Sequence, residues 1–133
     1  MFTALDARNA FNQLRLSERS QRLVAFSTYI NGIRQTYTTV GMPFGINGGP
    51  AYYQRMIDSA LYKFKRPHSD VEAYLDDLTL GSRASKEKSA IDNHLDDLER
   101  VLARLHSISF KMRLSKCKFL QEKIEVWGGC SDS

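Results

Sequence analysis

Two adjacent aspartates interrupt an otherwise apolar stretch near the middle of the chain, residues 71–81 (VEAYLDDLTLG). The flanking residues are apolar or β-branched, and the run is too short for a helix, so it predicts two short strands that meet at Asp76 and Asp77. Aspartate favours turns over strands because its side chain can hydrogen-bond its own backbone. Such a pair is most often a solvated turn. The functional alternative is a divalent-metal site, because a cation between two like charges relieves their repulsion.

A third carboxylate follows another short strand-like run at the beginning of the chain. Residues 2–5 are strand-like and lead into Asp6, and residues 7–14 are helix-like. Two strands that each deliver an aspartate at one end could gather three carboxylates, which is the oxygen-rich ligand set that Mg²⁺ prefers. Two such ions about 3.5–4 Å apart can clamp the attacking and leaving oxygens of a phosphoryl transfer.

Length and composition narrow the class of protein. The 133 residues are expected to form one domain, 1–133. The formal net charge of +4 permits an anionic partner without demanding one. No apolar run approaches the roughly 20 residues of a membrane span, so no membrane partner is expected. Cys117 and Cys130 lack the spacing of metal ligands, so we expect no zinc site, and reduced thiols in a cytosolic setting.

Turn and helix signals in the sequence indicate the elements between residues 17 and 64. Asn31-Gly32 lies between two β-rich runs over 23–40, and this dipeptide predicts a hairpin because both turn positions need positive φ. Residues 17–22 are polar and are interpreted as a loop. Glycines followed by Pro50 predict the start of a helix over 50–64.

A second helix is predicted over 85–107, with Ser85 as its N-cap. Apolar residues recur there at spacings of three and four and predict one buried face: Ile91, Leu95, Leu98, Leu102 and Leu105. By the same periodicity, the neighbouring pair Asp96-Asp97 is expected at the surface. Together the elements predict an α/β (α+β) two-layer sandwich, in which an antiparallel sheet bearing the carboxylates is backed by two helices.

Five motifs, in order, resemble those of reverse transcriptases from the gypsy class of long-terminal-repeat retrotransposons. Tyr74-Leu75-Asp76-Asp77 resembles their aspartate-pair signature, and Leu5-Asp6 with residues 11–13 (FNQ) resembles their first carboxylate motif. Met42-Pro43-Phe44-Gly45, continuing to Gln54-Arg55, resembles the second motif. Residues 114–119 (LSKCKF) and 126–128 (VWG) resemble the motifs after the aspartate pair.

The resemblance implies a reverse-transcriptase palm in which the hairpin over 23–40 belongs to the fingers. The implied reaction is templated DNA synthesis, in which a primer 3′-hydroxyl attacks the α-phosphate of a deoxynucleoside triphosphate. It implies Mg²⁺ as the cofactor, with Mn²⁺ as a substitute, and an RNA or DNA template with its primer as partner. Upstream fingers, thumb, connection and RNase H regions, known in the family, are absent from these 133 residues. We therefore expect an excised or eroded core of a polyprotein, in a cytoplasmic retroelement particle or in the nucleus. On its own this core is expected to be weak or inactive as a polymerase.

The resemblance also assigns roles to individual residues. Asp6, Asp76 and Asp77 are the implied catalytic metal ligands, with Asp6 and Asp76 the principal ones, and Lys116 is the implied proton donor to the leaving pyrophosphate. The ring of Phe11 is implied to be a steric gate that excludes a 2′-hydroxyl. The other implied nucleotide-binding residues are Ala7, Pro43, Phe44 and Gly45. The implied template and primer contacts are Gln54, Arg55, Tyr74, Trp127 and Gly128.

Two other functions stay open on the residues alone. One is a non-catalytic reverse-transcriptase-like remnant that acts as a scaffold, but such a remnant has no need of three acids. The other is a small nucleic-acid-binding domain in which aromatic side chains on the sheet stack on bases. Asp76 and Asp77 would repel phosphate there, whereas the basic run over 111–118 would favour phosphate contact.

Overall fold

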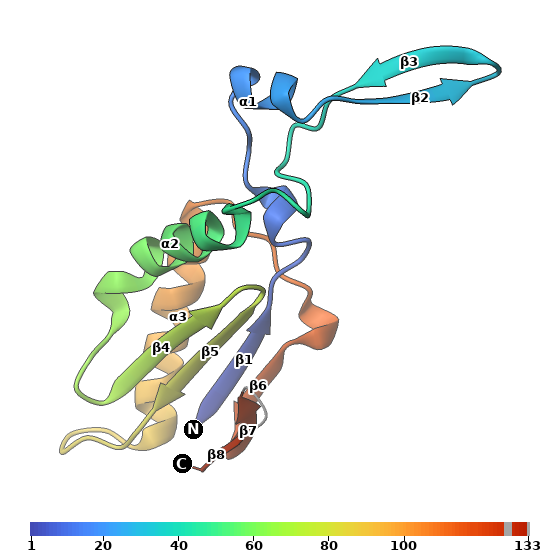
Figure 1. Cartoon of the computed structure of the whole chain (residues 1–133). Coiled ribbons are helices and arrows are strands. Elements are labelled where there is room, and N and C mark those ends of the chain that lie inside the picture. The colour runs from blue at the N-terminus through green and yellow to red at the C-terminus, as the bar shows by residue number, and fades with distance from the viewer. Residues whose placement is uncertain (127–128, 133) are drawn as a thin grey trace.

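The computed structural model describes residues 1–126 and 129–132. Its centre is an antiparallel sheet with strand order β4-β5-β1-β6, and two helices, α2 and α3, cover one face of this sheet (Figure 1). The strands are β1 (Phe2–Asp6), β4 (Ser69–Tyr74), β5 (Asp77–Ser82) and β6 (Lys118–Gln121), and the helices are α2 (Gly49–Leu61) and α3 (Ala90–Ser107). The predicted two-layer α/β sandwich is confirmed.

Short elements complete the chain. They are α1 (Glu18–Leu23), the hairpin strands β2 (Phe26–Ile30) and β3 (Ile33–Tyr37), and the strands β7 (Lys123–Val126) and β8 (Gly129–Asp132). Three single turns of 3₁₀ helix are η1 (Phe11–Gln13), η2 (Tyr62–Phe64) and η3 (Leu114–Lys116). No helix among the described residues is long and apolar enough to cross a membrane.

Strand alternation gives the sheet one buried face and one open face. Leu5 of β1, Val71 of β4 and Leu80 of β5 point to the helices and are almost fully buried. They pack against the apolar side of α2 and α3, where Tyr53 and Leu105 are completely enclosed. The alternate residues, among them Asp6 and Asp77, therefore lie on the face without helices.

The β2–β3 hairpin stands apart from this core (Figure 1). Asn31 and Gly32 at its tip both have positive φ, at 51° and 77°, as an Asn-Gly turn requires. All ten strand residues are exposed, and the rings of Phe26 and Tyr37 stack on each other across the two strands at 5.9 Å. The hairpin is therefore held by its own pairing rather than by the sheet.

Two local predictions near the start of the chain were wrong. Residues 17–22, expected to be a loop, begin α1, because the Ser17 hydroxyl caps the helix by accepting from the N–H of Ser20. Residues 7–14, expected to be helical, form only the single turn η1. Asn9 has φ of +50°, which is incompatible with a continuous helix.

The second helix also differs from its prediction. It begins at Ala90 with Ser89 as N-cap, whereas Ser85 closes a separate turn with Lys88. Ile91 and Leu95, expected to be buried, are about half exposed, while Asn93, His94 and Asp97 are buried. The expectation that Asp97 lies at the surface was wrong, and only Asp96 of that pair is exposed.

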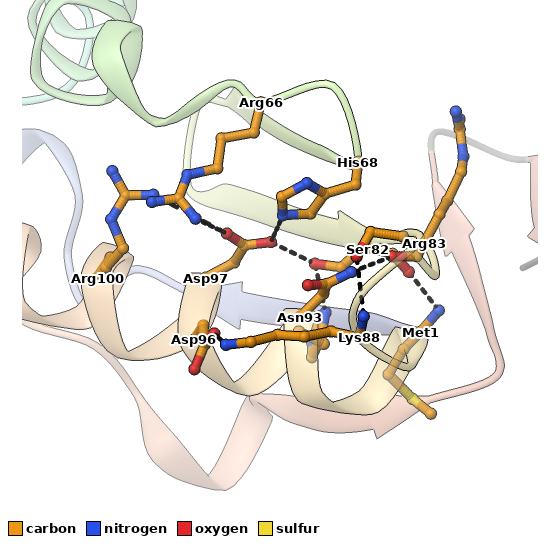
Figure 2. A network of polar contacts seen from close by, with 12 residues as sticks. Met1, Arg66, His68, Ser82, Arg83, Lys88, Asn93, Asp96, Asp97 and Arg100 are labelled. Carbon is orange, nitrogen blue, oxygen red and sulfur yellow. Dashed lines mark hydrogen bonds and ion pairs between the residues drawn. The ribbon is translucent and has the colours of Figure 1, made fainter.

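A chain of polar contacts explains why α3 turns these polar residues inward (Figure 2). The Ser82 hydroxyl donates to the Asp97 carboxylate at 3.0 Å, so it must accept from Nδ1–H of His94, 3.1 Å away. Nε2 of His94 then accepts from the Thr3 hydroxyl at 2.7 Å. Figure 2 shows Arg66, His68 and Arg100 grouped around Asp97, and the ion-pair distances are 3.6–4.0 Å. The network therefore adds polar contacts between α3 and the strands β1 and β5 to the apolar packing of the core.

Candidate functional site

The three predicted carboxylates meet at one end of the sheet. Asp6 and Asp77 are direct partners in the β1–β5 ladder, so their side chains project from the same, open face. Asp76 lies in the β4–β5 turn beside them, and its carbonyl accepts a hydrogen bond from the N–H of Ala7 at 2.8 Å. Leu75, which precedes Asp76, has φ of +52°. A left-handed residue lets the chain reverse tightly enough to bring both aspartates of the turn to this end.

The charges of the site act on one another. Burial raises the pKa of the Asp77 carboxyl, the negative charges of Asp76 and Asp6 raise it further, and the positive charge of Lys116 lowers it. Lys116 in η3 therefore lies near enough to act on the carboxylates. A second cation, Arg113, has its Nε 3.9 Å from Oδ1 of Asp6. The site is thus an acidic centre bordered by two basic side chains.

The donor set fits a hard divalent cation. All the candidate ligand atoms are carboxylate oxygens, the type that Mg²⁺ prefers. Oδ1 of Asp6 is buried and has no hydrogen-bond partner among the described residues. The Nε of Arg113, 3.9 Å away, is too distant for a hydrogen bond, so the ion pair compensates this anionic oxygen only in part. Among the described residues, no group of three acidic, histidine or cysteine side chains lies close enough together to hold a metal ion. A cation at this site would therefore have to bring the carboxylates closer together.

An aromatic cluster lies beside the carboxylates. The ring of Phe11 meets Phe44 edge-on and Tyr53 at a tilt, with both centroid distances at 5.3 Å. Tyr53 is fully buried, and its hydroxyl has no hydrogen-bond partner among the described residues. Burial raises the pKa of the Tyr53 phenol, and the charge of Asp76 raises it further. The phenol therefore lies under the carboxylate turn in its neutral form.

The predicted nucleotide-binding residues surround this cluster on two segments. Ala7 is buried directly after Asp6, and Phe11 is half-buried in η1. On the loop before α2, Pro43 is half-buried, Phe44 is 73% exposed and Gly45 has φ of +87°. The fold therefore brings the two segments together through the Phe11–Phe44 contact.

The predicted template and primer residues are more dispersed. Gln54 of α2 uses its amide within the chain, donating to the carbonyl of Ala73 at 2.6 Å and accepting from the N–H of Leu75 at 2.9 Å. Arg55 is exposed on α2, and Tyr74 is half exposed at the end of β4. Trp127 and Gly128 lie outside the described residues.

Sequence reasoning missed several residues that the fold brings to the site. Arg113 was grouped only with a basic run, and Tyr53 was an unremarked helix residue. Cys117 accepts a hydrogen bond at its Sγ from the N–H of Asp6, at 3.4 Å. Residues 111–113 run beside β1 and donate from Arg113 N to the Asp6 carbonyl at 2.9 Å. No local pattern signals the contacts of Arg113 and Cys117 with Asp6, because they join segments more than 100 residues apart.

Comparison with known proteins shows which family the sequence matches. The family described as reverse transcriptase (RNA-dependent DNA polymerase) matches residues 1–129. The retrovirus-related Pol polyproteins from the Drosophila melanogaster transposons opus and 297 are 34% identical over 129 residues and 31% identical over 127 residues. Each alignment covers 96% of this chain, but this chain spans only 12% and 11% of those polyproteins.

Solved structures show the same fold. The prototype foamy virus protease–reverse transcriptase superposes with a TM-score of 0.79 at 23% identity, covering 99% of this chain and 16% of that one. The foamy viral enzyme in complex with an RNA/DNA hybrid gives a TM-score of 0.76 at 22% identity, over 97% of this chain and 16% of that one.

Proposed function

Because this chain belongs to the reverse transcriptase (RNA-dependent DNA polymerase) family, we propose that it is the palm, with part of the fingers, of a gypsy-class retrotransposon polymerase. The substrates are a deoxynucleoside triphosphate and a primer paired with an RNA or DNA template. The observation that carries the proposal is the meeting of Asp6, Asp76 and Asp77 at the open face of the sheet. The five motifs set out above support the finer class.

Each part of the site has a role in nucleotidyl transfer. Asp6 and Asp76 are the principal metal ligands, with Asp77 beside them, and when bound Mg²⁺ or Mn²⁺ would activate the primer hydroxyl and stabilise charge on the phosphate. Lys116 lies near enough to the carboxylates to lower the pKa of Asp77, and in this role it donates a proton to the departing pyrophosphate. Positioning and charge stabilisation, rather than covalent chemistry, are what the protein supplies.

The aromatic cluster selects and orients the nucleotide in this proposal. Phe11 packs against Phe44 and Tyr53, and in this proposal its ring is the obstacle to a 2′-hydroxyl. Ala7, Pro43 and Gly45 complete the nucleotide contacts. Arg55 and Tyr74 are the proposed contacts for the template and primer, together with Trp127 and Gly128, which lie outside the described residues. Gln54 acts with them by holding the Asp76 turn.

The partners and location follow from the same proposal. A foamy virus relative of this fold has been solved with an RNA/DNA hybrid, which supports a primer–template duplex on the open sheet face of this chain. The hairpin over 23–40 contributes to the fingers. The remaining polyprotein domains are further partners, and the chain works in cytoplasmic retroelement particles, with the nucleus as a second site.

Metal binding tests the proposal in the chain as it stands. Asp6, Asp76 and Asp77 repel one another, so millimolar Mg²⁺ or Mn²⁺ should raise the melting temperature by binding the folded state. Asp76→Asn should abolish this rise. Asp96→Asn is the matched control, because Asp96 is an exposed member of an equivalent Asp-Asp pair on α3, ion-paired to Lys88.

Primer extension tests the chemistry itself. In a complete polymerase that carries this core, oligo-dT on poly-rA with dTTP and Mn²⁺ should be extended, and Asp76→Asn should remove the activity while Asp96→Asn keeps it. Equal loss in both variants contradicts the assignment of the metal ligands. Duplex binding that is unaffected by metal and by Asp76→Asn would instead favour the non-catalytic scaffold or nucleic-acid-binding function.

A further inference from the structure

The side chain of Gln13 makes three hydrogen bonds, all to main-chain groups outside η1. Its amide nitrogen donates to the carbonyls of Arg8, at 2.5 Å, and Lys111, at 2.8 Å. Its amide oxygen accepts from the N–H of Lys111 at 2.7 Å. An amide that pairs with both the N–H and the C=O of one residue reproduces a rung of an antiparallel ladder. The side chain thus continues the pairing of β1 with residues 111–113.

These bonds close the loop that follows Asp6. The loop is fastened at its start, where Arg8 N donates to the Lys111 carbonyl at 3.0 Å, and at its end, where Gln13 holds the same residue. Between the two fastenings lie Asn9, with φ of +50°, and a single 3₁₀ turn. A left-handed asparagine and a three-residue 3₁₀ helix have little stability of their own. The conformation of the loop therefore depends on its two fastenings to Lys111.

Phe11 lies inside this loop, two residues before Gln13. Its ring packs on Phe44 and Tyr53, but ring contacts tolerate sliding, and Phe44 belongs to a loop and is itself 73% exposed. Main-chain hydrogen bonds are more directional than ring packing. The distance of the Phe11 ring from the carboxylates is therefore set more by the Gln13 fastening than by the aromatic cluster.

We propose that Gln13 is a positioning residue, which holds the Phe11 loop against Lys111 and thereby sets how strictly the site discriminates the sugar of an incoming nucleotide. The inference rests on the proposed function, in which the ring of Phe11 excludes a 2′-hydroxyl. Gln13 itself touches neither the carboxylates nor the nucleotide, and it is half-buried rather than part of the core. Its removal should consequently loosen the loop without unfolding the sheet.

Amide hydrogen exchange tests the fastening in the 133-residue chain. In Gln13→Ala, the Lys111 amide loses its acceptor, and residues 8–13 lose their second anchor. Amide exchange of Lys111 and of residues 8–13 should become at least about tenfold faster, because the free energy of local opening falls. Gln13→Glu keeps the acceptor but places a carboxylate against two carbonyls, and it should loosen residues 8–13 as well. Asn12→Ala is the matched control, because Asn12 is its exposed neighbour, and among the described residues its side chain makes no hydrogen bond.

Sugar selection tests the consequence. With oligo-dT on poly-rA, in a complete polymerase that carries this core, Gln13→Ala should lower the ratio of incorporation efficiencies for dTTP over UTP by about fivefold or more, mainly through a lower KM for UTP. Mg²⁺ should stabilise Gln13→Ala as much as the wild type. The Asn12→Ala ratio should equal the wild-type ratio.

The outcomes separate the two levels of the proposal. Unchanged exchange at Lys111 in Gln13→Ala overturns the fastening. Faster exchange with an unchanged dTTP/UTP ratio overturns the role in sugar selection. Wild-type chain that extends no primer and binds no metal overturns the proposed function, and exchange at Lys111 then still decides whether Gln13 holds the loop.

Discussion

Gly41 lies where the chain returns from the hairpin and crosses η1. A Cβ at this position would be 2.3 Å from the carbonyl oxygen of Asn12, a backbone atom that cannot move away without shifting the Phe11 loop. The next residue is tied to the same region, because Met42 N donates to the Leu14 carbonyl at 2.8 Å. The close approach therefore couples the hairpin end to the candidate site.

Gly41→Ala is expected to destabilise the fold by about 2 kcal/mol or more, through main-chain displacement. Gly49→Ala is the control, because a Cβ there meets the flexible Met42 side chain at 3.4 Å, an ordinary contact at the start of a helix, and should change stability by less than about 0.5 kcal/mol. Urea unfolding of both variants measures the difference. Equal stabilities would show that Asn12 has room to move.

Among the secondary-structure elements, strands and turns were predictable, whereas the rotation of α3 was not. Residues 71–81 carried a period-two pattern interrupted by turn residues, and the structure has β4 and β5 meeting there. For α3 the apolar spacing indicated a face through Ile91 and Leu95. The structure buries His94 and Asp97 instead, because hydroxyls of Thr3 and Ser82 lie under the helix and hydrogen-bond to His94 and to Oδ2 of Asp97. Periodicity within one helix cannot reveal what the facing strands offer.

This network should make stability depend on pH. Burial lowers the pKa of His94 below its usual 6.5, and the N-terminal ammonium lowers it further, while Asp97 raises it. Below pH 6.5 the unfolded chain binds a proton that the folded chain does not, so stability is present above this pH and is lost as the pH falls. We expect a loss of at most about 1.4 kcal/mol per pH unit between pH 6.5 and 5.5.

Denaturant unfolding at pH 7.5 and 5.5 measures this dependence. His94→Gln should be less stable than the wild type at pH 7.5. Its free energy of unfolding should, however, differ much less between pH 7.5 and pH 5.5 than that of the wild type. His106→Gln, at an exposed position of the same helix, should keep it. Asp77 acts with the opposite sign at lower pH, because its pKa is raised from 3.8, so the comparison stays above pH 5.5. A dependence unchanged in His94→Gln would assign the proton to another group.

The molecule as a whole combines a packed sheet-and-helix body with a hairpin whose strand residues are all exposed. The motif order predicted which segments meet at the site, since Asp6 ends β1, Asp76 lies in the β4–β5 turn and Asp77 begins β5. It could not predict the contacts of Arg113, Cys117 and Gln13 with residues near Asp6, because these depend on how the chain returns to β1 after α3. The contacts that residues 111–117 make near Asp6 complete the site.

Independence of the hairpin gives a prediction for the whole chain. Replacing residues 26–37 by a short glycine linker should change the free energy of unfolding by less than about 1 kcal/mol, because a solvent-exposed, two-stranded hairpin is only marginally stable. Its amides should exchange with little protection, whereas those of β1 and β5 should exchange only through global unfolding. Thermal melts and hydrogen exchange of the two chains measure this. A large loss of stability would mean that the hairpin supports the core.

The grip of Gln54 on the β4–β5 turn also bears on self-association. β4 is an edge strand, and an open edge is a template on which a strand of another chain can pair. Ser69 exchanges two hydrogen bonds with Arg66 at one end of this edge, and the Gln54 amide occupies the Ala73 carbonyl at the other. An incoming strand could pair only around Val71, which is too short a ladder to persist. The side chain that steadies the aspartate turn thereby also shields the β4 edge of the sheet from strand pairing with another chain.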